Sequence, residues 1–220
     1  MHRFVFISDT HNKHRQLTIP ECDFLIHSGD VSSMGYEHEI NNFLSWFNKQ
    51  PARYKIFIAG NHDWLYERNR LLAKSLIPKG IVYLEDEEII LDGFKLYGSP
   101  VQLEFCNWAF NKTEDQLKKY WKAIPDDTDI LITHSPAYGI LDEVNNNGIH
   151  LGSPSLYKEV NERLNLLIHS CGHIHSSHGT MKRSNILFIN ASNLNEKYEV
   201  AYKPVIVEID DNRKIIVLQE

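Results

Sequence analysis

Several continuous apolar runs in this sequence end abruptly in residues that carry carboxylate, amide or imidazole groups. Residues 54–59 end in Gly-Asn-His-Asp at positions 60–63, and residues 4–8 end at Asp9. Continuous rather than alternating hydrophobicity predicts strands that are buried on both faces. Polar groups at the carboxyl ends of such strands converge on one edge of an α/β fold, where ligands bind. The pattern therefore predicts an α/β protein whose functional site lies at its strand ends.

Apolar residues at helical spacing predict helices over residues 36–49 and 64–76. A third helix is predicted over residues 154–164, where Pro154 suits the first helical turn. Thr113 and Gln116 predict a further helix that begins with a capping box. The first of these helices falls between the second and third predicted strands. The resulting β-β-α-β order favours parallel pairing in the first part of the chain.

Antiparallel strands are predicted for the middle and the end of the chain. Residues 81–84 and 89–91 flank an acidic turn, and Asp92-Gly93 is typical of a hairpin. Because there is no linker, low-complexity tract or tandem repeat, we expect a single domain over residues 1–220. Three further strands are expected to close the chain in antiparallel fashion: residues 186–189, 205–209 and 215–218.

Composition excludes some classes of partner. A net charge of −6 gives no field for tracking a nucleic-acid backbone, although a bound metal can still attract a small anionic substrate. Cys22, Cys106 and Cys171 are odd in number at unrelated spacings, which favours reduced thiols over a disulfide framework. No apolar run approaches the roughly 20 residues that cross a bilayer, and no signal-peptide pattern is present. We expect a cytoplasmic protein without a membrane partner; its oligomeric state is not predicted.

Five predicted strand ends present residue types that bind metal ions. Carboxylate and imidazole together suit Mn²⁺, Fe or Zn²⁺ better than Ca²⁺. Seven candidate ligands are too many for one tetrahedral ion and about right for two. A shared aspartate would hold the two ions roughly 3.5–4 Å apart, as in two-metal sites that act on phosphate esters. The candidate ligands are Asp9, His11, Asp30, Asn61, His134, His173 and His175.

The ordered motifs resemble those of the calcineurin-like metallophosphoesterases. They are Asp-x-His at 9–11, Gly-Asp at 29–30, Gly-Asn-His-Asp at 60–63, the lone His134 and Gly-His-x-His at 172–175. Any one of them is a weak signal, whereas five in order, each after an apolar strand, are specific. The resemblance implies a four-layer α/β/β/α sandwich of two mixed sheets, with the metals above the join of the sheets.

Within this family, the chain is most similar to the small MPPED-type phosphodiesterases. That resemblance implies activity on phosphodiesters, including cyclic nucleotides, with two divalent transition metal ions. Mn²⁺ is the expected metal, with Fe, Zn²⁺, Ni²⁺ or Co²⁺ as alternatives.

The resemblance also implies a role for each candidate ligand, with Asp30 bridging the two ions. The ligands of one ion would be Asp9, His11, Asp30 and His175. The ligands of the other would be Asp30, Asn61, His134 and His173. His62 matches a histidine that binds no metal but contacts the substrate phosphate and protonates the leaving oxygen.

The expected reaction is hydrolysis of a small phosphodiester by a metal-bridging hydroxide, with His62 as the general acid and Asn61 helping to neutralise the phosphoryl oxygens. Met34 stands where protein phosphatases of this family carry an arginine that grips the phosphate. A dianionic monoester loses more from that change than a monoanionic diester does. His150, shortly before a predicted helix, is a further candidate substrate contact, because helix N-termini bind anions.

Other functions remain open on the sequence. A phosphomonoesterase, or a nuclease that acts on nucleic-acid ends, uses the same type of centre, so the substrate could be a nucleotide or a nucleic-acid end. A catalytically silent interaction scaffold is an alternative of another class, and the complete set of ligands together with His62 argues against it.

Several residues near these motifs have plainer interpretations. Asp63 is read as an orienting or turn carboxylate, and His14 as a solvated loop residue. Trp108, Phe105 and Phe110 could stack on a nucleobase, but packing of their loop on the core is the favoured interpretation.

Overall fold

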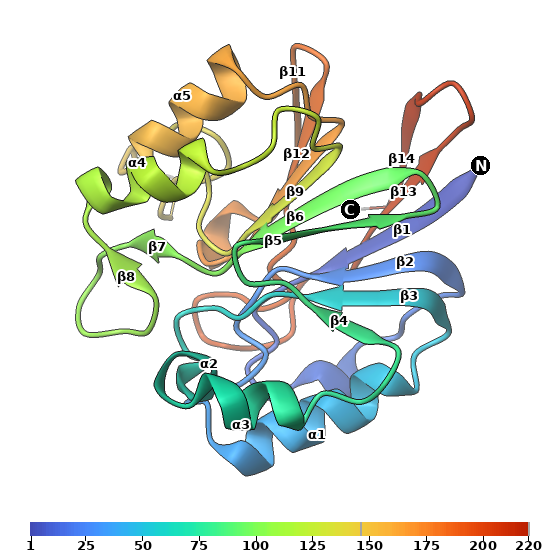
Figure 1. Ribbon diagram of the computed structural model, residues 1–220, viewed down its shortest axis with the longest axis vertical. Coiled ribbons are helices and arrows are strands. Elements are labelled where there is room, and N and C mark those ends of the chain that lie inside the picture. Colours follow the sequence, from blue (N-terminus) through green and yellow to red (C-terminus); the bar gives the residue numbers. More distant parts are fainter. Residues whose placement is uncertain (146, 220) are drawn as a thin grey trace.

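The computed structural model describes residues 1–145 and 147–219, and two six-stranded mixed sheets form its centre (Figure 1). The strands of the first sheet are β1 (His2–Ile7), β2 (Cys22–His27), β3 (Ala52–Phe57), β4 (Ile81–Tyr83), β13 (Val205–Ile209) and β14 (Ile215–Gln219). They lie in the order β14-β13-β1-β2-β3-β4. The strands from β1 to β4 are parallel to one another, whereas β13 runs antiparallel to both β1 and β14.

The second sheet is also mixed. Its strands are β5 (Glu87–Leu91), β6 (Phe94–Ser99), β9 (Ile130–Thr133), β10 (Ile168–Cys171), β11 (Gly179–Arg183) and β12 (Ile186–Asn190). Their order is β11-β12-β10-β9-β6-β5, with the four central strands parallel and both edge strands antiparallel. A separate pair of short strands, β7 (Gln102–Leu103) and β8 (Asn111–Lys112), lies outside both sheets.

Helices cover the outer face of each sheet, which completes four layers (Figure 1). On the first sheet lie α1 (Glu37–Asn48), α2 (Trp64–Arg68) and α3 (Arg70–Ser75). On the second lie α4 (Glu114–Lys122) and α5 (Pro154–Glu162). Two single turns of 3-10 helix span His14–Gln16 and His175–Ser177. The predicted α/β/β/α sandwich of two mixed sheets is therefore confirmed.

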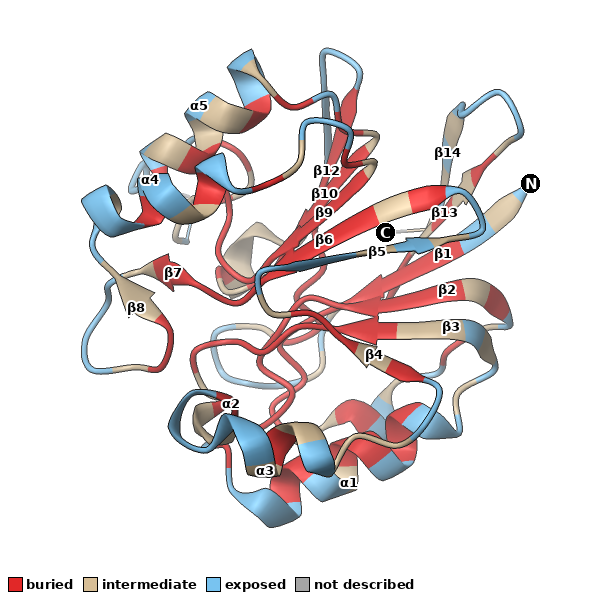
Figure 2. Cartoon of the chain, in the orientation of Figure 1, coloured by how far each residue is buried: buried red, intermediate tan, exposed pale blue. Residues whose placement is uncertain are grey.

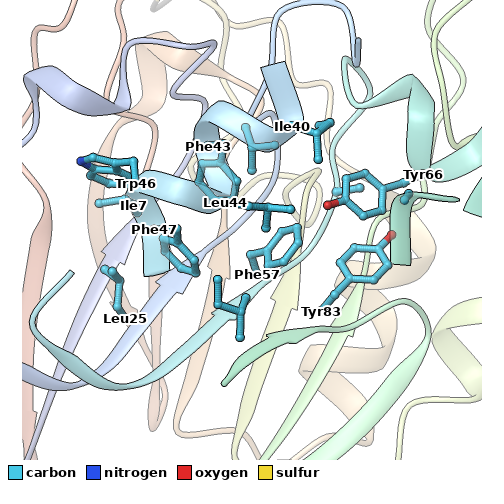
Figure 3. Packing of buried hydrophobic residues seen from close by; sticks show 14 of the residues in the cluster. Ile7, Leu25, Ile40, Phe43, Leu44, Trp46, Phe47, Phe57, Tyr66 and Tyr83 are labelled. Atoms are coloured by element: carbon cyan, nitrogen blue, oxygen red, sulfur yellow. The ribbon is translucent and has the colours of Figure 1, made fainter. Parts of the chain in front are cut away.

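Three hydrophobic clusters fill the spaces between these layers. Most of the inner strands are buried along most of their length, whereas β5, β11 and β14 are not (Figure 2). Between α1 and the first sheet, Phe43 and Phe47 pack on Phe57 of β3, with ring centroids 5.5 and 6.1 Å apart (Figure 3). Between the sheets, Phe4 of β1 meets Phe94 of β6 edge to face at 5.2 Å. Each buried side chain of this size contributes roughly 1.5–3 kcal/mol, so the sheets are held rigidly behind their common edge.

Local signals at helix ends are reproduced in the structure. Thr113 and Gln116 form the predicted capping box, each side chain accepting the backbone N–H of the other at 3.3 and 2.9 Å. Pro154 occupies the first turn of α5, as predicted. The predicted helix over residues 64–76 is instead two helices, because Asn69 leaves the helical conformation and caps α3 by accepting the N–H of Leu72.

Strand pairing differs from the prediction in two places. Strand β4 is not part of an antiparallel middle section but extends the first sheet in parallel to β3. Strand β12 is antiparallel to β11 but parallel to β10. Strand β11 was not predicted, because its polar and exposed residues carry no apolar pattern. No helix in the described ranges is long and apolar enough to cross a membrane.

Candidate metal centre

The seven candidate ligands all follow parallel strands, at the edge where the two sheets meet. Asp9, Asp30 and Asn61 come after β1, β2 and β3 of the first sheet, whereas His134 and His173 come after β9 and β10 of the second. The parallel strands of both sheets point toward this common region (Figure 1). The structure therefore brings together residues that lie up to 166 positions apart, His175 being the last.

Asp30 lies at the middle of the cluster. Its Oδ2 atom is 3.4 Å from Nε2 of His134 on one side and 3.6 Å from Nε2 of His11 on the other. Oδ1 of Asn61 lies 2.9 Å from Nε2 of His134, which adds a further oxygen ligand there. The carboxylate of Asp30 is thus placed between two sets of donors.

The two sets of metal-ligand atoms can be defined by the distances between their atoms. In three groups, one potential ligand atom of each residue lies within 4.8 Å of the atoms of the others. Two groups match the two expected positions, and the third includes His62. The groups are Asp9-His11-His175, Asp30-His134-His173 and His11-Asp30-His62.

Three of the four candidate histidine ligands share one hydrogen-bonding pattern at Nδ1. Nδ1 of His11, His134 and His175 lies 3.2, 2.9 and 3.0 Å from the backbone carbonyls of Ser32, Ser28 and Asn195. A neutral imidazole that donates its Nδ1–H to a carbonyl has an unprotonated Nε2, which is the form that binds metal. The carbonyls thus preset the tautomer of each ring.

The residues present fit metal ions. Nε2 of His11 is buried and has no hydrogen-bond partner. A buried polar atom without a partner destabilises the fold, and a metal ion bound to Nε2 would remove that cost. Burial lowers the pKa of His11 to about 4 and that of His173 to about 3, so both are neutral at pH 7. Burial also disfavours charge on His134, but the carboxylate of Asp30 outweighs it and raises the pKa of His134 to about 9. A cation between these two groups would replace that proton.

A cavity of about 350 Å³ opens beside the cluster. It is bordered by His11, Asp30, Asn61, His62, Leu103, Glu104, Phe105, Trp108, Ser135, Leu151, His173, Ile174, His175 and Tyr198. Within the described part of the chain, no lysine or arginine borders it. Its lining combines apolar and aromatic side chains with five of the seven candidate ligands, since Asp9 and His134 do not border it.

A family model described as calcineurin-like phosphoesterase matches residues 2–177, which contain every candidate ligand. The chain belongs to the calcineurin-like phosphoesterase family. Membership implies a metal-dependent hydrolase of phosphate esters, a family that typically binds two divalent ions.

Individual phosphoesterase relatives agree with this result. The chain is 33% identical over 234 residues to Metallophosphoesterase domain-containing protein 1 of Homo sapiens, covering 96% of this chain and 72% of that protein. It is 33% identical over 221 residues to UPF0046 protein K07C11.7 of Caenorhabditis elegans, covering 94% and 75%. These relatives confirm the MPPED-type resemblance. The crystal structure of TT1561 of Thermus thermophilus shares the fold, with a TM-score of 0.66 at 13% identity over 99% and 98% of the two chains.

The backbone of this phosphoesterase is strained where it presents ligands. Asp9, His11, Asp30 and His173 have φ angles of 52°, 38°, 57° and 69°, in the left-handed region. Among non-glycine residues, aspartate, asparagine and histidine enter this region most readily. Such strain persists only where the surrounding structure fixes it, and it concentrates at functional sites.

Motif glycines allow the ligand turns of the phosphoesterase to approach one another. A Cβ atom at Gly60 would collide with Asp30 and with the ring of His134. A Cβ atom at Gly172 would collide with the carboxylate of Asp9. These glycines are therefore required by the close packing of the ligands around them.

Asp63 fixes two of these turns, as its orienting interpretation predicts. Its buried carboxylate accepts the N–H groups of Val31, Ser32 and Gly60 at 3.1, 2.9 and 2.8 Å. Burial, followed by the nearby charge of Asp30, raises the pKa of Asp63 to about 6. The turn after β2 and the turn after β3 are thereby tied into one unit.

His62 lies among the ligands but is held differently. Its backbone N–H donates to Oδ1 of Asp30 at 2.8 Å, and its Nδ1 lies 2.7 Å from the carbonyl oxygen of Ser33. Its ring stands edge to face against His11, with centroids 4.6 Å apart. With Nδ1 engaged, Nε2 is the free atom of His62 at the cavity.

The other histidines singled out in the sequence lie outside the cavity wall. Nδ1 of His150 pairs with the buried carboxylate of Asp142 at 2.6 Å, while its neighbour Leu151 borders the cavity. The prediction of a solvated His14 is wrong: its ring is buried against Phe43 and Trp46, on the inner side of the short turn His14–Gln16.

Sequence reasoning missed Tyr198 and the loop that carries it. The ring of Tyr198 borders the cavity and stands edge to face with His11 and His175, at 4.9 and 5.3 Å. The carbonyl of Asn195 in the same loop orients His175. No motif marks this loop, because its contribution to the centre is a backbone carbonyl and a ring edge.

Proposed function

We propose that this protein is a phosphodiesterase that hydrolyses small diesters, with cyclic nucleotides and nucleotide-like diesters as the substrate class. The observation that carries this proposal is the cavity, which is bordered by Glu104 but by no lysine or arginine of the described chain. Apart from His62, a phosphate there has only metal ions to balance its charge. Because a monoester dianion carries one more negative charge than a diester, it is the less suited substrate.

The lining of the cavity supports the binding of an organic group beside the phosphate. Its volume of about 350 Å³ falls in the range of small-molecule sites. Leu103, Phe105 and Trp108 supply apolar surface next to the ligands. A nucleotide-sized diester fits these walls better than a long nucleic acid does, since the net charge of −6 opposes binding of a polyanion.

Two divalent ions are proposed to occupy the centre, one at the group around Asp9 and one at the group around His134, with Asp30 shared. The donors are carboxylate, amide and imidazole, a mixture compatible with Mn²⁺, Fe, Zn²⁺, Ni²⁺ or Co²⁺. Mn²⁺ is proposed first because of the resemblance to the small MPPED-type phosphodiesterases. When bound, such ions lower the pKa of the attacking water and neutralise the phosphate oxygens.

The chain itself supplies orientation and a proton. Asn61 borders the cavity with its Oδ1 2.9 Å from Nε2 of His134, and its side chain is proposed to stabilise a phosphoryl oxygen. His62 donates its Nδ1–H to the carbonyl of Ser33 and presents Nε2 to the cavity. In its doubly protonated form the ring also carries a proton on Nε2, which it can give to the leaving oxygen. His150 is kept as a proposed substrate contact because the next residue, Leu151, borders the cavity.

A matrix of metals and substrates tests this function. The protein is stripped with a chelator, reloaded separately with each candidate metal, and assayed on bis(4-nitrophenyl) phosphate, 4-nitrophenyl phosphate, cyclic nucleotides and a single-stranded oligonucleotide. We expect kcat/KM for the diester to exceed that for the monoester by at least about ten-fold, equivalent to about 1.4 kcal/mol. A faster monoester would contradict the proposal, a faster oligonucleotide would favour a nuclease, and inactivity with every metal would favour a silent scaffold.

The cysteines support a proposal on location. Cys22 and Cys171 are buried, Cys106 is exposed, and all three are free thiols. Free thiols persist in reducing compartments. We therefore propose that the protein acts in the cytoplasm.

A further inference from the structure

Trp108 makes a contact that the sequence did not predict. Its indole lies on the imidazole of His62, with ring centroids 4.0 Å apart and planes inclined by 29°. The side chain is half-buried and borders the cavity. Trp108 therefore packs on the side chain that is proposed as the proton donor, and not only on the hydrophobic core.

The loop that carries Trp108 is fastened to the turn that carries His62. The N–H of Ala109 donates to the carbonyl of Asn61 at 3.1 Å, and the N–H of Phe110 donates to Oε1 of Glu67 at 2.8 Å. Ala109 and Phe110 are both buried in the cluster under the first sheet. The indole is therefore held in place by its neighbours rather than lying loosely on the surface.

His62 needs such a support because its hydrogen bond to Ser33 and its contact with His11 still allow the imidazole ring to tilt. The hydrogen bond between Nδ1 and the carbonyl of Ser33 fixes one point of the ring. The edge contact with His11 limits motion on one side. A ring held at one point can still tilt, and the indole face blocks that tilt.

We propose that Trp108 is a positioning residue for His62 that holds Nε2 of the imidazole toward the leaving oxygen of the diester. This inference rests on the proposed function, in which His62 is the proton donor. The attacking hydroxide bonds to phosphorus, and the bond to the leaving oxygen breaks with its electron pair on that oxygen. The oxygen takes the Nε2 proton of a doubly protonated His62, which is left neutral with its remaining proton on Nδ1, donated to Ser33. A misplaced ring slows that transfer most when the leaving oxygen is strongly basic.

Two aryl diesters of similar shape separate this role from substrate stacking. Diphenyl phosphate releases phenolate, whose conjugate acid has a pKa of about 10, as in tyrosine. Bis(4-nitrophenyl) phosphate releases a much weaker base, because the nitro group spreads the charge. Loss of a stacking contact with the substrate would slow both, whereas loss of proton delivery slows the first selectively.

We expect Trp108→Leu to lower kcat on diphenyl phosphate by about 10- to 100-fold and on bis(4-nitrophenyl) phosphate by less than about three-fold. Trp108→Phe, which keeps a ring against His62, should restore kcat on diphenyl phosphate to within about three-fold of the wild type. Phe105→Leu is the matched control, because Phe105 is an aromatic residue of the same loop that borders the cavity without stacking on His62. It should show no dependence on the leaving group. Metal content and melting temperature are measured for every variant.

Parallel assays of His62→Ala distinguish the two ways of failing. If His62→Ala shows no leaving-group dependence, the proposed function and this inference both fail. If His62→Ala shows it and Trp108→Leu slows both substrates equally or neither, this inference alone is overturned. The same holds if Trp108→Phe is as defective as Trp108→Leu on diphenyl phosphate.

Discussion

Asp30→Asn is expected to remove both metal ions and to lower phosphodiesterase activity by about 10³-fold or more, which corresponds to about 4 kcal/mol. Oδ2 of Asp30 lies within 3.6 Å of Nε2 of His11 and within 3.4 Å of Nε2 of His134. A neutral amide has no charge to share between two cations, and its NH₂ group repels them. Metal content per chain and kcat on bis(4-nitrophenyl) phosphate measure the two effects.

The control for this variant is Asp86→Asn. Asp86 has almost the same left-handed backbone as Asp30, with φ of 56° against 57°, but its side chain accepts a hydrogen bond from Ser99 away from the centre. Asp86→Asn should keep both ions and full activity. If Asp30→Asn retained one ion at full occupancy, the bridging role would be wrong.

His62→Ala is expected to lower kcat on a diester with a poor leaving group by about 10²- to 10⁴-fold while the metal content stays at the wild-type value. The reason is that Nδ1–H of His62 is donated to Ser33, so that in the doubly protonated ring the Nε2 proton is the one left for the leaving oxygen. His62 also lies in one of the three groups close enough to hold an ion. Metal analysis therefore decides between its two roles.

An exposed histidine provides the comparison. His38 lies on α1, stacked against Tyr36, and His38→Ala should change neither metal content nor activity. Loss of one ion from His62→Ala would make His62 a ligand and end its assignment as the proton donor. An unchanged kcat on a diester with a poor leaving group would also end the assignment of His62 as the proton donor.

Much of the centre could be predicted because its signals are local. Each ligand follows a run of apolar residues that is buried on both faces, and parallel strands bring their carboxyl ends together whatever the order of the sheet. Asp9, Asp30 and His134 could therefore be selected without knowing which strands are neighbours. The capping box at Thr113 is likewise encoded within four residues.

Features that depend on distant pairing could not be predicted. Strand β12 carries no mark that distinguishes a parallel from an antiparallel neighbour, and the break at Asn69 depends on the cap that it forms for α3. Trp108 and Tyr198 reach the centre on loops whose paths are set by buried neighbours. His14 is buried because α1 packs over it, although its sequence context is polar.

The shared edge has a thermodynamic consequence. Because the ligands come from β1, β2 and β3 of one sheet and from β9 and β10 of the other, ions bound there cross-link the two halves of the sandwich. The unfolded chain has no such arrangement, so ion binding adds directly to the free energy of unfolding, by about 1.4 kcal/mol per site for each ten-fold rise in free metal above its Kd. The stability of this protein would then be a function of metal concentration, and ions bound for the proposed chemistry would also hold the two sheets together.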